Sequence, residues 1–221
     1  MNEWNIISED LNTLPGPPIP RLICPYRPAT TQLLIFCDAS PKAYCAVAYL
    51  RASSVGSTHV SFLMGKTRVA PVKDLTIPRS ELPGVHLGSV LVKTILRELT
   101  SLPPSEVYIW TDSLIVLSWL KTQRTLPIFV RNRINAIQSN INQSDIKYVP
   151  TLDNPADYAT KRTPSVQSTQ SKWLAGPSWI SSPPESWPTQ PQTLPSAPED
   201  LTVATDAVVE DKFTNHRFLK I

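Results

Sequence analysis

The sequence lacks the features that would assign it to several large classes of protein. No stretch approaches 18 consecutive apolar residues, so we expect no membrane-spanning helix. The N-terminus has no basic region followed by an apolar run, so we expect no secretory signal peptide. The three cysteines, Cys24, Cys37 and Cys45, are odd in number and form no CxxC pair, which argues against a disulfide framework and a zinc knuckle. An intracellular protein, in the cytoplasm, is therefore expected.

Proline is in excess, with 23 of 221 residues, about twice the average usage. Six prolines lie in residues 1–30, ten in 31–165 and seven in 166–221. Charge divides at the same boundaries, because residues 31–165 carry 15 Lys and Arg against 9 Asp and Glu, whereas both flanks are slightly acidic. We therefore predict a Pro-rich lead-in (1–30), a basic domain (31–165) and a Pro- and Trp-containing tail (166–221), with a linker over 181–200.

Hydrophobic periodicity predicts that the middle domain is an α/β fold. Short apolar runs predict strands at 33–37, 43–51, 59–69, 107–110 and 146–149, the first of them buried on both faces. Helical spacing of apolar residues predicts helices at 80–99, 113–120 and 128–141. Asn154 and Pro155 predict the start of a last short helix, because Asn is a good N-cap and Pro fits the first helical position. The order βββαβααβα predicts a five-stranded mixed sheet with helices packed on it.

Four acidic residues stand where a solvated acid is not expected. Asp38 and Asp112 each follow an apolar strand, Glu81 lies at the start of the buried helix, and Asp157 lies in the first turn of the last helix. Two strand ends and two helix starts can converge at one edge of a sheet, where clustered carboxylates require a counter-charge. Mg²⁺ prefers such oxygen ligands, and two ions about 4 Å apart clamp the attacking and leaving oxygens of a phosphoryl displacement. Taken singly, each acid is explained as well by a turn or cap: Asp112 as a helix N-cap, Asp157 as a favourable charge at a helix start.

Four motifs that contain these acids occur in order along the chain: FCDAS at 36–40, LTIPRSEL at 75–82, WTDS at 110–113 and VPTLDNPAD at 149–157. With KTRVAP at 66–71 and WLAGPSW at 173–179, they resemble the ribonuclease H (RNase H) region of Pao/BEL-type LTR retrotransposon polyproteins over about residues 30–180.

The resemblance implies an RNase H-like fold and hydrolysis of the RNA strand of an RNA–DNA hybrid with two Mg²⁺ ions, or Mn²⁺ in their place. By the same resemblance, Asp38, Glu81, Asp112 and Asp157 take the places of the metal-binding carboxylates. It also implies reverse transcriptase and integrase portions of a polyprotein as partners, no membrane, and a virus-like particle where the element is active.

Pro83 and Leu114 are among the positions that depart from the family pattern, and two other functions remain open. Pro83 kinks its helix if it lies in the interior and costs little in the first turn, and Leu114 stands where a polar residue able to reach the hybrid is common. The second hypothesis is a catalytically inactive RNase H fold that binds nucleic acid or acts as a spacer. The third is an aspartic peptidase, which needs paired Asp-Thr/Ser-Gly turns, and the glycine is missing after both Asp38 and Asp112.

A polyanionic substrate suits the basic excess of residues 31–165. The candidate contacts to nucleic acid are Arg79, Ser113, Lys121, Arg124, Arg131 and Arg133. Solvated cations on ordinary helix faces explain the basic members of this set equally well. The tail tryptophans are expected to pack back onto the domain rather than stack on bases: Trp173, Trp179 and Trp187.

Overall fold

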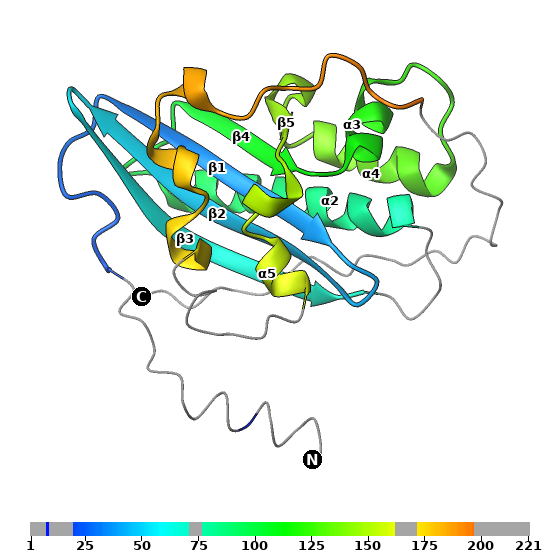
Figure 1. Ribbon diagram of the computed structural model, residues 1–221, viewed down its shortest axis with the longest axis horizontal. Helices are drawn as coiled ribbons and strands as arrows, with labels where there is room; N and C mark the ends of the chain where they lie inside the picture. The colour runs from blue at the N-terminus through cyan, green and yellow to red at the C-terminus, as the bar shows by residue number, and fades with distance from the viewer. Residues whose placement is uncertain (1–7, 9–19, 71–76, 162–171, 197–221) are drawn as a thin grey trace.

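The computed structural model describes residue 8 and residues 20–70, 77–161 and 172–196. Three consecutive strands form an antiparallel meander, and two later strands add in parallel beside the first, which gives the sheet order β3-β2-β1-β4-β5 (Figure 1). This confirms the predicted five-stranded mixed sheet. The strands are β1 (Thr30–Ala39), β2 (Ala43–Ser54), β3 (Ser57–Val69), β4 (Glu106–Thr111) and β5 (Ile146–Tyr148).

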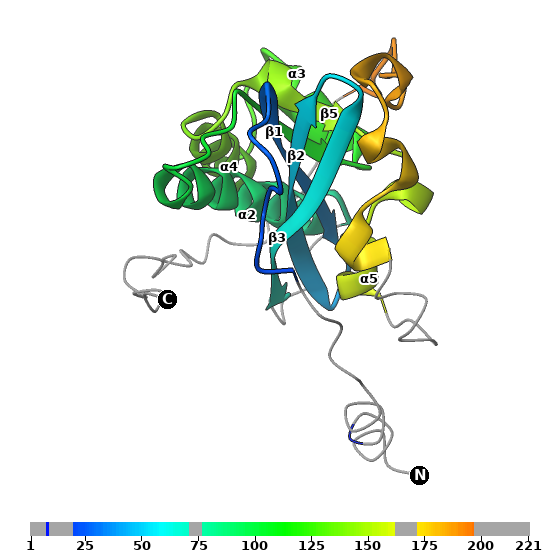
Figure 2. The same ribbon diagram turned by 90° about the vertical axis from the view of Figure 1, so that its left-hand side faces the viewer.

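The longer helices cover one face of the sheet and the short last helix lies on the other (Figure 2). They are α2 (Ile77–Glu98), α3 (Leu114–Lys121), α4 (Ile128–Gln138) and α5 (Asp157–Thr160). The element order βββαβααβα is as predicted, and no described helix is long and apolar enough to cross a membrane. Helix α2 begins three residues earlier than predicted, so Pro83 lies inside it and removes one helical hydrogen bond. Helix α4 ends three residues before the predicted 141, and the chain continues there as turns.

The central strand β1 is buried on both faces, as predicted. Because side chains alternate along a strand, Leu33 and Ile35 face the helices while Leu34 and Phe36 face the opposite layer, and all four have no exposed surface. Hydrophobic packing on both faces therefore holds β1 in place, and with it the residues that follow the strand.

Residues 173–187 cover the face of the sheet opposite the helices, whereas Leu194 packs against the helix-side cluster and the Pro195 carbonyl oxygen accepts a hydrogen bond from the Ser118 hydroxyl of α3. The Trp179 and Trp110 ring centroids lie 4.9 Å apart, and Ile180 is 1% exposed, so the tail tryptophans pack back as expected. The predicted linker over 181–200 is wrong for the described residues 181–196. The Arg51 guanidinium donates hydrogen bonds to the carbonyl oxygens of Ile180 and Ser182. The Trp187 ring packs against the hydrophobic cluster that contains Trp110 and Ile180. Burial of large aromatic rings offsets the ordering entropy that the polar composition alone does not.

Candidate functional site

Asp38 and Asp112 lie side by side at the carboxyl ends of two neighbouring parallel strands. Cys37 of β1 pairs with Thr111 of β4, so the next residue of each strand lies at the same edge of the sheet. Adjacent strands are about 4.8 Å apart. Asp38 is 8% exposed, and the Asp112 carboxylate accepts a hydrogen bond from the Thr151 hydroxyl at 2.8 Å.

Glu81 reaches the same edge from α2. A Cβ atom on Gly84 would lie 2.8 Å from the backbone oxygen of Asp38, so the absence of a side chain there lets α2 approach the end of β1. The Ser113 hydroxyl donates a hydrogen bond to the Glu81 carboxylate. The same hydroxyl accepts from the Val116 amide at 3.2 Å and caps α3, so the interpretation of Asp112 as the N-cap is wrong. Ser113 therefore orients Glu81 and leaves the Asp112 carboxylate available at the site.

Asp157 is brought to the site by contacts that fasten α5 to β1. The Asn154 amide donates to the Cys37 carbonyl oxygen at 2.9 Å, and the Ser40 hydroxyl donates to the Thr160 carbonyl oxygen at 2.9 Å. Asp157 is the first residue of α5, and its carboxylate forms an ion pair with Lys161, four residues later. Both ends of this four-residue helix are thus held against the strand that carries Asp38.

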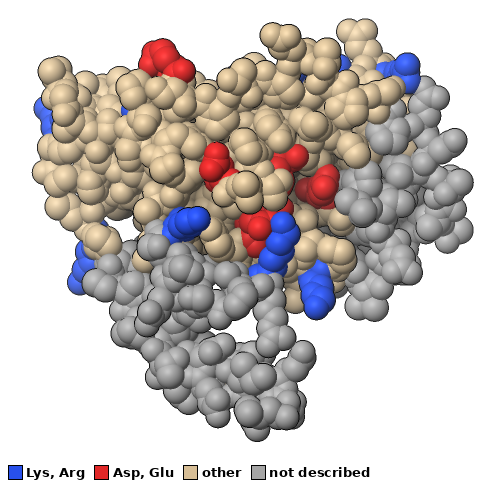
Figure 3. All heavy atoms as spheres, viewed as in Figure 1, with Lys and Arg blue, Asp and Glu red and all other residues tan. Residues whose placement is uncertain are grey.

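The charge of Asp112 acts on both Asp38 and Glu81, and the charge of Asp157 acts on Asp38. The pKa of Asp38 is raised to about 6, with burial as the largest cause; the charges of Asp112 and Asp157 also raise it, whereas the hydrogen bond from Thr160 and the charge of Lys161 lower it. Figure 3 shows acidic side chains gathered near the middle of one face, with Lys and Arg side chains beside them.

Burial also raises the pKa of Glu81, and the charge of Asp112 adds to this effect while the hydrogen bond from Ser113 opposes it. The charge of Asp112 thus raises the pKa of both Asp38 and Glu81. A cation placed among these groups would stabilise their ionised forms, and carboxylate oxygens are the ligands that Mg²⁺ prefers. The chemistry of the donor set fits a hard divalent cation.

Within the part of the chain that the structure describes, no group of three or more His, Cys, Asp or Glu side chains is placed to hold a metal ion. Each of the four carboxylates instead contacts a hydroxyl or an amine on a neighbouring element: Thr160 for Asp38, Ser113 for Glu81, Thr151 for Asp112 and Lys161 for Asp157. A metal would therefore have to compete with these contacts.

The candidate nucleic-acid contacts other than Ser113 lie away from the acidic edge or outside the described side chains. Arg124 and Arg131 line a hollow of about 360 Å³ between the α3–α4 connection and α4. The Arg133 guanidinium stacks 3.6 Å from the centre of the Phe129 ring, and Lys121 is exposed at the end of α3. Arg79 belongs to the first turn of α2, but its side chain lies outside the described residues.

Sequence reasoning missed the residues that contact the carboxylates. Lys161 carried a signal, because a Lys four residues after an Asp on a helix is a favourable pair. Thr160 had no such signal, since its contact with Asp38 spans 122 residues and exists only once α5 is docked.

A family model described as the Pao retrotransposon-like RNaseH-like domain matches residues 1–113, which include Asp38, Glu81 and Asp112 but not Asp157. A search of curated proteins finds no match. Among solved structures, the chain is similar to the N-terminal RNase H domain of a Mycobacterium tuberculosis protein, with 16% identity over 64% of this chain and 96% of that one and a TM-score of 0.41. It is also similar to RNase H1 from Halobacterium salinarum, with 12% identity over 60% and 94% of the two chains and a TM-score of 0.37. LC11-RNase H1 in complex with an RNA/DNA hybrid matches with 12% identity over 58% and 91% and a TM-score of 0.37.

Proposed function

Because the chain belongs to the Pao retrotransposon-like RNase H-like domain family, we propose that it hydrolyses the RNA strand of RNA–DNA hybrids at the edge of its sheet. One observation supports this most strongly. The charge of Asp112, at the end of β4, raises the pKa of both Asp38, at the end of β1, and Glu81, on α2. A cation among these three carboxylates, which come from three separate elements and have Asp157 beside them, would offset the cost of their burial and mutual repulsion.

The proposed ligands of two Mg²⁺ ions, or Mn²⁺ in their place, are Asp38, Glu81, Asp112 and Asp157. When bound, the ions supply an activated water and a charge that stabilises the leaving oxygen. The protein's own contribution is positional: β1 and β4 fix Asp38 and Asp112, Ser113 orients Glu81, and the fastening of α5 to β1 sets Asp157. No nucleophilic side chain is required for this reaction.

A catalytically inactive RNase H fold that binds nucleic acid is the second candidate. It is favoured by the contacts that each carboxylate already makes, since hydroxyls and an amine satisfy them without a metal. The two candidates differ in one property: both bind a hybrid, and only the first cuts it in a Mg²⁺-dependent manner.

The family also supports a setting for this activity. We propose that the domain works beside reverse transcriptase and integrase portions of a retrotransposon polyprotein, in the cytoplasm and in virus-like particles where the element is active. Co-purification of such portions with the domain from a virus-like particle fraction would test this, and their consistent absence from it would contradict the proposal.

A cleavage assay tests the function. The purified chain is incubated with a 5′-labelled RNA–DNA hybrid in Mg²⁺ and in EDTA, beside Asp38→Asn and the matched control Asp145→Asn. Asp145 directly precedes β5, whose first residue pairs with Ile109 of β4, so it lies at the end of β5 that is away from the site. We expect Mg²⁺-dependent cutting of the RNA strand by the wild type and by Asp145→Asn only. Equal cutting by Asp38→Asn, or none by the wild type, would contradict the proposal.

A further inference from the structure

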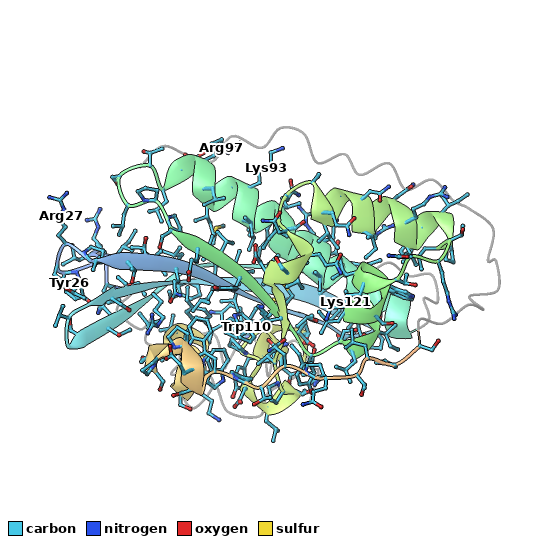
Figure 4. The ribbon with its side chains drawn as sticks, turned by 90° about the horizontal axis from the view of Figure 1, so that it is seen from above. Tyr26, Arg27, Lys93, Arg97, Trp110 and Lys121 are labelled. Atoms are coloured by element: carbon cyan, nitrogen blue, oxygen red, sulfur yellow. The ribbon has the colours of Figure 1, made fainter. Side chains whose placement is uncertain are left out.

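The described tail crosses the β5 edge of the sheet and ends on α3. The Gln190 side chain binds the backbone of β5: its oxygen accepts from the Tyr148 amide at 2.7 Å, and its nitrogen donates to the Tyr148 carbonyl oxygen at 3.0 Å. Leu194 then packs against the helix-side cluster, and the Ser118 hydroxyl of α3 donates to the Pro195 carbonyl oxygen at 2.7 Å. Figures 1 and 4 show the end of the described tail beside α3. The chain is therefore delivered to the surface of this helix.

The surface of α3 and α4 is basic. Residues 113–144 contain four Lys and Arg and no Asp or Glu. Lys121 is exposed at the end of α3, three residues after Ser118 and so about 5 Å further along the helix axis. Arg131 of α4 is exposed and, with Arg124, lines the hollow of about 360 Å³ that also borders the last turn of α3. Among the described residues that line this hollow, none is acidic. We call Lys121, Arg124 and Arg131 the basic α3–α4 surface.

The sequence that follows the described tail is acidic. Residues 197–211 contain five Asp and Glu and no Lys or Arg: Glu199, Asp200, Asp206, Glu210 and Asp211. A chain spans at most about 3.6 Å per residue, so the first of these acids lies within about 14 Å of Pro195. A short tether of this kind gives an effective concentration in the millimolar range. Opposite charges on one chain are thus confined to the same region of the molecule.

We propose that residues 197–211 bind the basic α3–α4 surface through contacts of their carboxylates with Lys121 and Arg131. Arg presents a fork of donors that matches a carboxylate, and Lys supplies a compact charge beside it. A single exposed ion pair contributes little, so the contact depends on several acids and on the tether. Because the surface is also a candidate contact for nucleic acid, the docked segment competes with a hybrid for it. This last consequence rests on the proposed function.

Carbodiimide cross-linking of the full chain tests the contact without reference to activity. The reagent joins a carboxylate to an amine with no spacer, and mass spectrometry locates the linked pair. Each yield is divided by its value in the urea-unfolded chain. We expect Lys121 to be joined to acids of residues 197–211 at least about fivefold more than Lys93, an exposed lysine on the outward side of α2 (Figure 4). Raising NaCl from 0.1 M to 1 M shortens the Debye length from about 10 Å to about 3 Å and is expected to lower the Lys121 yield about threefold or more.

A substitution on the basic surface gives a second test that keeps the cross-linking amine. Arg131→Gln removes one exposed charge, and we expect the Lys121 yield to fall about threefold. Arg97→Gln removes an exposed charge from α2 and is expected to leave the Lys121 yield within about 1.5-fold of the wild type. Equal yields at Lys121 and Lys93, or a Lys121 yield that responds neither to salt nor to Arg131→Gln, would overturn the inference. Cross-links that occur only between two copies of the chain would overturn it as well.

Added hybrid separates this inference from the proposed function. In Mg²⁺-free buffer, a saturating RNA–DNA hybrid is expected to lower the Lys121 yield about fivefold, because both polyanions need the same cations. An unchanged yield with the hybrid bound contradicts the competition. A chain that forms the Lys121 cross-links but cuts no hybrid contradicts the hydrolysis and leaves the docked segment standing. A chain that cuts the hybrid but forms no such cross-links contradicts the docked segment alone.

Discussion

The Thr160 hydroxyl donates a hydrogen bond to the Asp38 carboxylate and so joins the last helix of the domain to the end of its central strand. This bond lowers the pKa of Asp38 and opposes the larger effect of burial, which raises it. The same contact places Asp157, three residues earlier, within reach of Asp38. A single threonine thus serves both the docking of α5 and the ionisation of the site.

The raised pKa of Asp38 predicts that this residue destabilises the metal-free protein near neutral pH. A carboxyl whose pKa rises from 3.8 to about 6 on folding retains its proton in the native state while the unfolded chain releases it. The associated stability is present below pH 4, is lost as the pH rises through 6, and amounts to about 3 kcal/mol at most. We therefore expect Asp38→Asn to be more stable than the wild type at pH 8 in EDTA and similar to it at pH 4, measured by urea unfolding.

Mg²⁺ is expected to reduce that difference at pH 8, because a bound cation favours the ionised carboxylate of the wild type. Asp145→Asn is the control and should show no such dependence on Mg²⁺. An Asp38→Asn protein that is less stable than the wild type at pH 8 would contradict this account of the buried carboxyl.

The close approach of α2 to Asp38 predicts a specific cost for a side chain at Gly84. An added Cβ would lie 2.8 Å from the Asp38 backbone oxygen, so α2 must shift and carry Glu81 with it. We expect Gly84→Ala to lose about 1–3 kcal/mol of stability and to weaken Mg²⁺ binding, measured by calorimetry. Gly88→Ala, one turn later, meets the Cys37 side chain instead and should lose stability with a smaller effect on Mg²⁺ affinity. Equal Mg²⁺ affinities in Gly84→Ala and the wild type would refute this role.

The buried Arg51 predicts that the tail belongs to the folded domain. Arg51 is 6% exposed, and its guanidinium donates to the carbonyl oxygens of Ile180 and Ser182 and, at 2.7 Å, to the side-chain oxygen of Gln32. Arg51→Met leaves these acceptors without their donor and should cost about 2–4 kcal/mol, with a red shift of the tryptophan fluorescence as the tail detaches. Arg97→Met, which removes an exposed Arg on α2, should change neither quantity by a comparable amount. A tail that stays in place with Arg51→Met would show that the aromatic contacts suffice alone.

The strands and the acidic edge were predictable from local sequence, because each rests on a short-range pattern. The run from Leu33 to Cys37 is buried on both faces, as its continuous apolar character predicts, and Asp38 and Asp112 follow such runs directly. The start of α2 was not fixed locally, since both Pro78 and Ser80 suit the beginning of a helix, and the structure begins the helix at Ile77.

The remaining features depend on contacts between distant parts of the chain. The hydroxyls of Thr160 and Ser113 meet their carboxylates only after α5 and α3 have docked, and no local pattern marks them. The tail reads as a linker by composition, yet Trp187 packs against the ring of Trp110, 5.7 Å between centroids. Figure 4 shows Trp110 on the side of the sheet away from the long helices, where those rings collect. Composition alone does not predict this packing, because the sheet face against which the tryptophans pack exists only in the folded domain.

The rate of RNA cleavage by Asp112→Asn tests the central claim most directly, because the charge of Asp112 acts on both Asp38 and Glu81. The assay uses an RNA–DNA hybrid in Mg²⁺, with the wild type and Asp145→Asn as references and urea unfolding to confirm the fold. If the four carboxylates work as one metal site, Asp112→Asn cuts at least about 100-fold more slowly while Asp145→Asn cuts as the wild type does. A folded Asp112→Asn protein that cuts at the wild-type rate would contradict the claim.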